Sequence, residues 1–184
     1  MKNILKSTLL LMCGAFILAS CADDNDSNPV LQKPTKFVLN TPALATNGTY
    51  DLANSSTVEF TCTQPDYGFP ISTKYTIEIA TKADMSNATT MSTSFKTAKM
   101  QVDAAEMAAA LTEQVVAEGK TEADFPIDIP VYVRAKATPL TAMGSEIDSL
   151  NHSYAIQSNI VKLTKVHLVF SLPPVTAPEH VYIT

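Results

Sequence analysis

Apolar and polar residues alternate in several short segments of the chain, which predicts β-strands that each bury one face. The alternation is clear in residues 57–63, 74–80 and 129–137, where every second residue is apolar. Weaker patterns at 36–40 and 90–96 predict two further strands. The central part of the chain therefore indicates a fold built mainly from short strands.

The segment 129–137 has the most regular pattern. We expect its inward face to carry the apolar residues Ile129, Val131, Val133 and Ala135. Its outward face then carries Tyr132, Arg134 and Lys136. We expect Tyr132 to be a cross-strand neighbour on the solvated side of the sheet.

The segment 158–170 changes phase partway along. Val161 and Leu163 lie in one alternation, whereas Val166 and Leu168 lie in the other. Because a regular strand keeps its alternation, this slip predicts a β-bulge or a break near Thr164.

One helix interrupts the strands after residue 103. Asp103 is a good N-cap, Glu106 follows three residues later as in a capping box, and Gly119 is suited to end the helix. Between them an apolar stripe recurs at helical spacing, made of Ala104, Met107, Ala108, Leu111 and Val115. Such a stripe is expected to pack on a sheet.

These elements predict an all-β fold over residues 35–170. Short strands separated by turn signals, with one short inserted helix, are typical of an immunoglobulin-like or fibronectin-III-like β-sandwich.

The first 20 residues have the pattern of a secretory signal peptide. Lys2 and Lys6 give a basic start, and the apolar run 9–18 is shorter than the roughly 20 residues that a membrane span needs. We therefore expect residues 1–20 to be removed from the mature protein.

Cys21 directly follows two small residues, Ala19 and Ser20. The sequence from Leu18 to Cys21 resembles the bacterial lipobox, which implies that Cys21 becomes the lipidated first residue of the mature chain. Two or more acyl chains hold a protein stably to a membrane, whereas a single chain holds it only weakly. The alternative is a plain signal peptide followed by an incidental cysteine.

An acidic run follows Cys21 and opens a tether over residues 21–34. The run consists of Ala22, Asp23, Asp24, Asn25 and Asp26. It resembles the surface-export signal of Bacteroidetes lipoproteins, which implies display on the outer face of the outer membrane. The alternative is a tether whose charges only keep it solvated.

The composition excludes several classes of function. The formal net charge of −5 argues against a nucleic-acid partner. The chain has only five glycines, and their spacing allows no phosphate-binding glycine loop.

The sequence also gives little support for an enzyme or for a bound cofactor. His152, His167 and His180 lack metal-ligand spacing, so we expect no metal site, and His167 is expected to point outward into solvent. The acidic residues are scattered, whereas glycosidases need two carboxylates that flank a cleft. Cys62 lies in phase with buried positions and is expected to be an inert thiol.

The composition changes again at residues 171–184. Three prolines stiffen this stretch into an extended linker, and residues 180–184 have the pattern of a strand. We expect residues 171–184 to be a linker that leads to the start of a further module, which this chain lacks.

Several segments together resemble the SusE-like outer-membrane lipoproteins of Bacteroidetes starch-utilisation systems. The resemblance rests on "CADDND" at the lipobox and on "PTKFVLNTPA", "QPDYGFPISTKYTIEI", "DFPIDIPVYVRAKA" and "VFSLPPVTAPEHVYIT". It implies an N-terminal immunoglobulin-like domain, anchored on the cell exterior beside SusC-like and SusD-like proteins. It also implies that starch or a related glycan binds mainly to later modules, which are absent here.

The chain offers few aromatic residues on which a sugar ring could stack. It has no Trp, and the aromatic residues that we most expect to be exposed are Tyr67, Phe69 and Tyr132. Tyr67 and Phe69 share the sequence "PDYGFP". They either pack within their own loop or contact a ligand or partner.

Two functions remain open. In the first, the chain supplies the anchoring and spacer domain of a glycan-binding system. In the second, it is a protein-interaction module that docks on a SusC/SusD-like complex and has no glycan contact of its own.

Residues 148–150 contain one further candidate site. The sequence Asp-Ser-Leu resembles the O-glycosylation site of Bacteroidetes proteins, which implies a sugar on Ser149. The alternative is an ordinary loop.

Overall fold

The computed structural model describes residues 29–149 and 152–171. The chain divides into two units, and every described helix and strand belongs to the second, Leu31–Thr184. The predicted signal peptide, Cys21, the acidic run and residues 172–184 lie outside the described residues.

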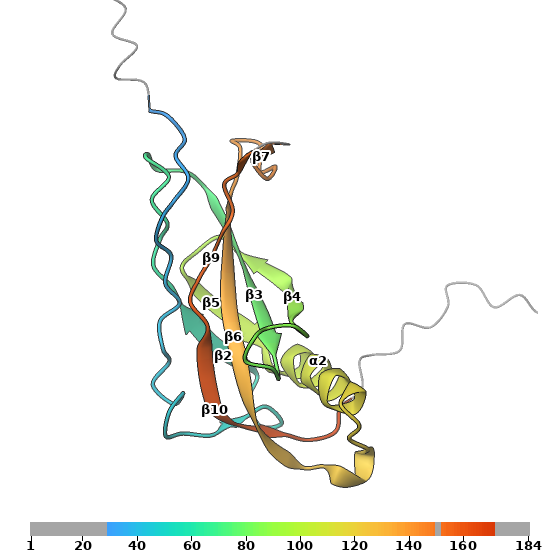
Figure 1. The fold of residues 1–184 in the computed structure, drawn as a ribbon. Coiled ribbons are helices and arrows are strands. Elements are labelled where there is room, and N and C mark those ends of the chain that lie inside the picture. The colour runs from blue at the N-terminus through green and yellow to red at the C-terminus, as the bar shows by residue number, and fades with distance from the viewer. Residues whose placement is uncertain (1–28, 150–151, 172–184) are drawn as a thin grey trace, which may run out of the picture. The chain divides into compact units, whose positions relative to one another are not determined.

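Two sheets form the body of this unit (Figure 1). The larger sheet has the order β1-β10-β6-β3-β4, with β9 also paired to β6, and the smaller sheet pairs β2 with β5. The strands of the larger sheet are β1 (Tyr50–Asp51), β3 (Thr73–Ala80), β4 (Thr89–Phe95), β6 (Ile127–Pro139), β9 (Ile156–Gln157) and β10 (Val161–Leu168). The smaller sheet consists of β2 (Thr57–Thr61) and β5 (Lys99–Asp103), and β7 (Asp148–Ser149) pairs separately with β8 (His152–Ser153).

The strand order is that of an immunoglobulin-like sandwich. In the larger sheet the neighbours β4, β3, β6 and β10 follow one another in the order of strands C′, C, F and G of that fold. The smaller sheet pairs β2 with β5, as strands B and E pair. The predicted all-β sandwich with one inserted helix is confirmed.

The core lies between the inner faces of the two sheets. The inward residues of β3 and β6 are fully buried, and those of β2 and β5 are buried opposite them. They include Ile77, Ile79, Val131, Val133, Ala135, Val58, Phe60, Met100 and Val102. The predicted inward phases of β2, β3 and β6 are confirmed, although Ile129 is only partly buried.

The helix α2 (Ala104–Ala117) packs against both sheets, beside β3 and β4 in Figure 1. The Asp103 side chain accepts a hydrogen bond from the Glu106 amide at 2.8 Å, which confirms the predicted N-cap. The Glu106 carboxylate, however, accepts from the Ser92 amide of β4 and not from the cap, so the capping box is only half formed. Gly119 follows the helix with φ of +99°, a conformation that glycine adopts without strain. A short 3₁₀ turn, η3 (Glu122–Asp124), then leads into β6.

The predicted irregularity near Thr164 is confirmed. The register between β10 and β6 shifts between Leu163 and Val166, and Pro130 lies opposite the shift. Proline has no amide hydrogen to donate to the neighbouring strand. A central strand therefore tolerates proline at a bulge, where a backbone hydrogen bond is missing in any case. The freed Thr164 amide donates instead to the Ala45 carbonyl at 2.8 Å.

The prediction of a regular strand at 36–40 is wrong. Only Leu39 forms a bridge, to Cys62, and the Asn40 amide and the Val38 carbonyl on either side of it hydrogen-bond to the Thr61 carbonyl and the Thr63 amide at 2.9 Å. The Leu39 amide donates to Asn159 Oδ1 at 2.9 Å, and the Val38 amide donates to Thr63 Oγ1 at 3.0 Å. The pairing of this segment with the end of β2 is thus limited to a single bridge.

Two other features follow from the described residues. Cys62 is a free, buried cysteine, and burial raises the pKa of its thiol to about 11, which agrees with an inert role.

Among the described residues, no helix has both the length and the apolar character that crossing a bilayer would require.

Candidate functional site

The loop between β2 and β3 holds the predicted site residues Tyr67 and Phe69. The Asp66 carboxylate accepts a hydrogen bond from the Gly68 amide at 2.8 Å, and Gly68 has φ of +88°. This tight Asx turn sends the two neighbouring aromatic side chains in different directions.

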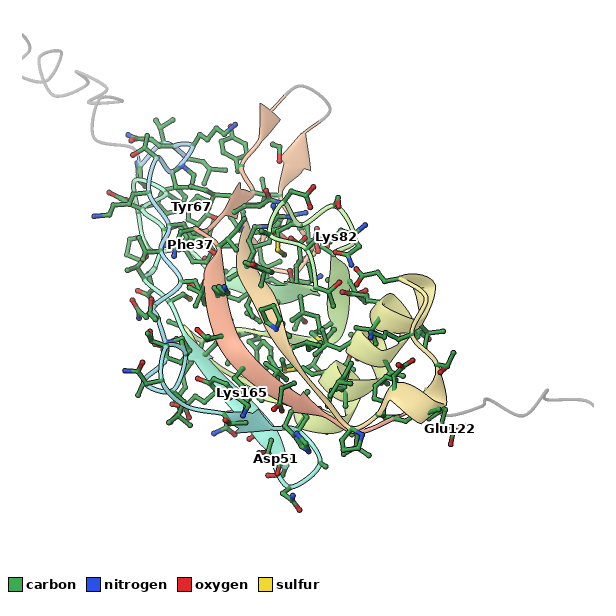
Figure 2. All side chains as sticks on the ribbon, turned by 60° about the horizontal axis from the view of Figure 1, so that its bottom comes forward. Phe37, Asp51, Tyr67, Lys82, Glu122 and Lys165 are labelled. Atoms are coloured by element: carbon green, nitrogen blue, oxygen red, sulfur yellow. The ribbon has the colours of Figure 1, made fainter. Side chains whose placement is uncertain are left out.

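Tyr67 is buried, so its predicted exposure is wrong. Its side chain is only 1% exposed, and its hydroxyl donates to the Ala137 carbonyl of β6 at 3.4 Å. Its own carbonyl accepts from the Gln32 amide at 2.9 Å, beside the N-terminal segment of the domain (Figure 2). Burial raises the pKa of the Tyr67 phenol well above its usual range. Tyr67 therefore fixes the loop to the sheet and offers no surface for stacking.

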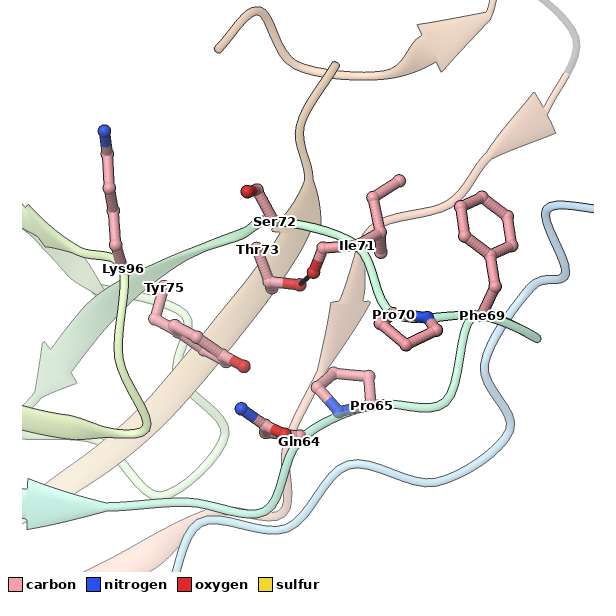
Figure 3. Close-up of a pocket in the computed structure, with 9 residues that line it drawn as sticks. All are labelled: Gln64, Pro65, Phe69, Pro70, Ile71, Ser72, Thr73, Tyr75 and Lys96. Atoms are coloured by element: carbon pink, nitrogen blue, oxygen red, sulfur yellow. Dashed lines mark hydrogen bonds between the residues drawn. The ribbon is translucent and has the colours of Figure 1, made fainter. Parts of the chain in front are cut away.

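Phe69 is half-buried and lies at the rim of a small pocket (Figure 3). The pocket has a volume of about 220 Å³, whereas ligand sites usually enclose roughly 300–1,000 Å³. Its lining residues are Gln64, Pro65, Phe69, Pro70, Ile71, Ser72, Thr73, Tyr75 and Lys96.

The floor of the pocket is formed partly by Tyr75. Its ring is 2% exposed and packs at 6.1 Å from the ring of Phe37, while its hydroxyl points toward Gln64 and Pro65 in Figure 3. Burial raises the pKa of this phenol, so it remains a neutral hydrogen-bonding group at neutral pH. The sequence pattern marked Tyr75 as a core residue and gave no sign of its polar end.

The residues that line the pocket carry no acidic or imidazole group. None of these nine residues is Asp, Glu or His. Glycoside hydrolysis needs a pair of carboxyl groups about the bond that is broken. The polar groups offered are an amide, hydroxyls and one lysine, which suit hydrogen bonds to a neutral or anionic ligand.

Further hollows include two that are lined by described residues. One of about 440 Å³ borders the same loop and is lined by Gln32, Lys33, Thr35, Lys36, Thr63, Gln64 and Asp66. The other, of about 260 Å³, lies between α2 and the loop after β3. Within residues 29–149 and 152–171, no group of three or more His, Cys, Asp or Glu is arranged to hold a metal ion.

His167 points outward from β10, as predicted, but its ring is paired with a carboxylate. Its Nδ1 lies 2.8 Å from Asp128 Oδ1 across the β6–β10 pair, and Lys165 Nζ lies 3.1 Å from the other carboxylate oxygen. Hydrogen bonds from these two side chains lower the pKa of Asp128. The cluster is a surface ion pair at the end of the sheet far from Tyr67, where Figure 2 labels Lys165 and Asp51.

The outward position of Tyr132 is confirmed. It faces Lys162 across the β6–β10 pair, and the Lys162 ammonium lies 5.9 Å from the centre of its ring. This is within the distance of a cation–π contact.

The remaining predicted sites are only partly described. Ser149 lies in β7, where it pairs with His152 of β8, so its backbone belongs to a short hairpin. Cys21 and the residues from Ala22 to Asp26 lie outside the described part of the chain.

Comparison with known proteins identifies a family for this chain. The model of the SusE family, described as SusE outer membrane protein, matches residues 23–136, which is more than half of the chain. No solved structure matches the chain.

Proposed function

Because the chain belongs to the SusE outer membrane protein family, we propose that it is the anchoring and spacer part of a surface glycan-binding lipoprotein. Membership in this family makes it an outer membrane protein of a Sus system. The proposal adds a lipid on Cys21, a position on the cell exterior, and glycan capture by modules outside residues 1–184.

One structural observation carries the spacer role. Every Phe and Tyr side chain in the described residues is buried or half-buried, and the large apolar side chains that are exposed are all aliphatic. Sugar sites hold pyranose rings against aromatic faces, with polar groups at the ring edges. A domain without such a platform is better suited to hold other modules away from the membrane than to bind starch.

The anchor is supported by the sequence before the domain. The run 9–18, the small residues before Cys21 and the acidic residues after it fit a lipidated and exported chain. Multiple acyl chains on Cys21 would give stable attachment.

Metabolic labelling with a radioactive fatty acid tests the anchor. We expect label on the wild-type protein and none on Cys21→Ala, whereas label that remains on the mutant would refute lipidation at this residue. In a second variant, Asp23, Asp24 and Asp26 are changed to Ala. This protein should keep the label but lose access to protease added to intact cells, and continued cleavage would refute the export role.

A second function, docking on a SusC/SusD-like complex, is favoured by a different observation. The half-buried Phe69 and the exposed Pro70 form an apolar rim around the pocket, and apolar and aromatic residues are common at protein interfaces. A pull-down of SusC-like and SusD-like proteins with the domain tests this function. Recovery that Phe69→Ala abolishes would support docking, and no recovery would leave the spacer role alone.

The glycosylation of Ser149 is a separate proposal. The Asp-Ser-Leu sequence at 148–150 motivates it. The intact mass of the protein from its native cells should exceed that of Ser149→Ala by the mass of a glycan. A difference equal to one oxygen atom alone would refute it.

A further inference from the structure

The outward face of the larger sheet carries more basic than acidic side chains. Lys74 of β3, Arg134 and Lys136 of β6, and Lys162 of β10 point to the same side, since their strand positions pair in register with outward neighbours. We call these four residues the basic face. They stand out in a chain whose net charge is −5.

Two of the four cations are neutralised by carboxylates. Arg134 Nη2 lies 2.6 Å from Glu78 Oε2, and Lys74 Nζ lies 2.6 Å from Glu146 Oε1. Lys136 and Lys162 form no ion pair with any carboxylate of residues 29–149 and 152–171. The basic face therefore has an excess of two positive charges on the outward side of the sheet.

The basic face is poorly suited to a protein partner. The exposed large apolar side chains of the described residues lie at positions 30, 44, 116, 143, 160 and 169, and none of these is in β3, β6 or β10. The aromatic ring of Tyr132 is already covered by Lys162. Protein interfaces are centred on apolar or aromatic groups and are depleted of lysine, whereas anionic lipid headgroups attract flat clusters of Lys and Arg.

The start of the domain lies at one end of the basic face. The Gln32 amide donates to the Tyr67 carbonyl at 2.9 Å, and the Tyr67 hydroxyl donates to the carbonyl of Ala137, the neighbour of Lys136. Cys21 precedes Gln32 by 11 residues, which span at most about 40 Å when fully extended. A lipid on Cys21 would thus keep this end of the sheet close to the bilayer.

We propose that the basic face docks on an anionic lipid surface and orients the domain on the membrane. This proposal rests on the proposed function, because the lipid anchor on Cys21 keeps the domain near the membrane. The interaction itself requires only the charges of the face and phosphate-bearing headgroups.

Vesicle binding by an unlipidated protein tests the docking separately from the anchor. Residues 21–184 with Cys21→Ser retain the whole described core, which lies within residues 37–168. The probes are vesicles of phosphatidylcholine alone and of phosphatidylcholine with one-third phosphatidylglycerol, assayed by co-sedimentation. We expect binding only to the anionic vesicles, weakening strongly between ~0.02 and ~0.3 M salt.

Two charge-reversed variants test whether the basic face is responsible. Lys136→Glu/Lys162→Glu should lower the partition coefficient at least about 20-fold, because each basic residue near an anionic surface contributes roughly a fivefold attraction. The matched control, Lys82→Glu/Lys120→Glu, makes the same change of charge at exposed positions outside β3, β6 and β10 and should have a much smaller effect.

Three outcomes would overturn the docking: no binding to anionic vesicles, equal loss in the two variants, or retention on polyglutamate beads without vesicle binding. The last would indicate an acidic protein partner. None of these outcomes bears on lipidation, since Cys21 is changed in every protein tested.

Discussion

The two faces of β6 differ in what they require of the sequence. On the inner face Val131, Val133 and Ala135 are fully buried and belong to the same hydrophobic core as residues of the opposite sheet and of α2. On the outer face Tyr132 and Arg134 are only partly covered, and their partners are charged side chains of the neighbouring strands.

This difference separates the residues that determine the fold from those that can carry function. Burial of an apolar side chain contributes roughly 1.5–3 kcal/mol, whereas an exposed ion pair contributes at most about 1 kcal/mol. The outer face can therefore change its charges without loss of the sandwich, and it is the face on which selection for a binding surface can act.

The largest expected effect is from a truncation on the inner face. Ile77→Ala should lower the free energy of unfolding by about 3 kcal/mol, because Ile77 is fully buried and a cavity would remain. The matched outer-face change on the same strand, Thr76→Ala, should cost less than about 0.5 kcal/mol. Urea denaturation of both variants measures the contrast, and equal losses would contradict it.

The next effect concerns the most covered ion pair of the outer face. Arg134→Met should destabilise the domain by about 1–3 kcal/mol, because Glu78 is 13% exposed and would lose its partner. Lys74→Met, whose partner Glu146 is 48% exposed, is the control and should cost less than about 0.5 kcal/mol. Adding Glu78→Leu to Arg134→Met should restore part of the loss, and a double mutant less stable than the single one would contradict this account.

A smaller effect is expected at the start of α2. Asp103→Ala removes the side chain that accepts from the Glu106 amide, so we expect a loss of about 1 kcal/mol in thermal or urea unfolding. Glu113→Ala, a change in the middle of the same helix, serves as the control. A cap variant as stable as this control would show that α2 is held by packing alone.

The smallest effect is a pH dependence from Cys62 on the inner side. Its thiol ionises near 9.0 when unfolded, and burial raises its pKa to about 11 when folded. Between these values the unfolded state holds fewer protons, so the free energy of unfolding falls as pH rises, by less than about 1 kcal/mol at pH 9.5. Cys62→Ala should lose this component of the pH dependence, and identical slopes for the two proteins would contradict it.

Local patterns predicted those elements whose signals are themselves local. The helix followed from Asp103, the apolar stripe and Gly119, and the inward face of β6 followed from alternation alone. The bulge in β10 followed from a change of phase, although the role of Pro130 opposite to it depends on strand pairing. The strand β5 was missed because its only apolar residues are Met100 and Val102, directly before the helix cap.

The errors involve contacts between residues that are far apart in the sequence. The segment 36–40 forms only one bridge, since the Val38 amide bonds to the Thr63 side chain and the backbone of Leu39 bonds to Asn159, about 120 residues away. Tyr67 is buried because it reaches Ala137, which is 70 residues away. Its loop sequence of proline, aspartate and glycine gives the turn but not the direction of each ring.

The central claim, that this domain is a spacer without a glycan site of its own, is tested most directly by affinity electrophoresis in starch gels. The protein is residues 21–184 with Cys21→Ser, with Phe69→Ala as its matched variant. Because every aromatic side chain of the described residues is at least half-buried, we expect both proteins to migrate at the same rate with and without starch. Retardation of the parent protein that Phe69→Ala abolishes would contradict the claim and make the pocket beside Phe69 a sugar site.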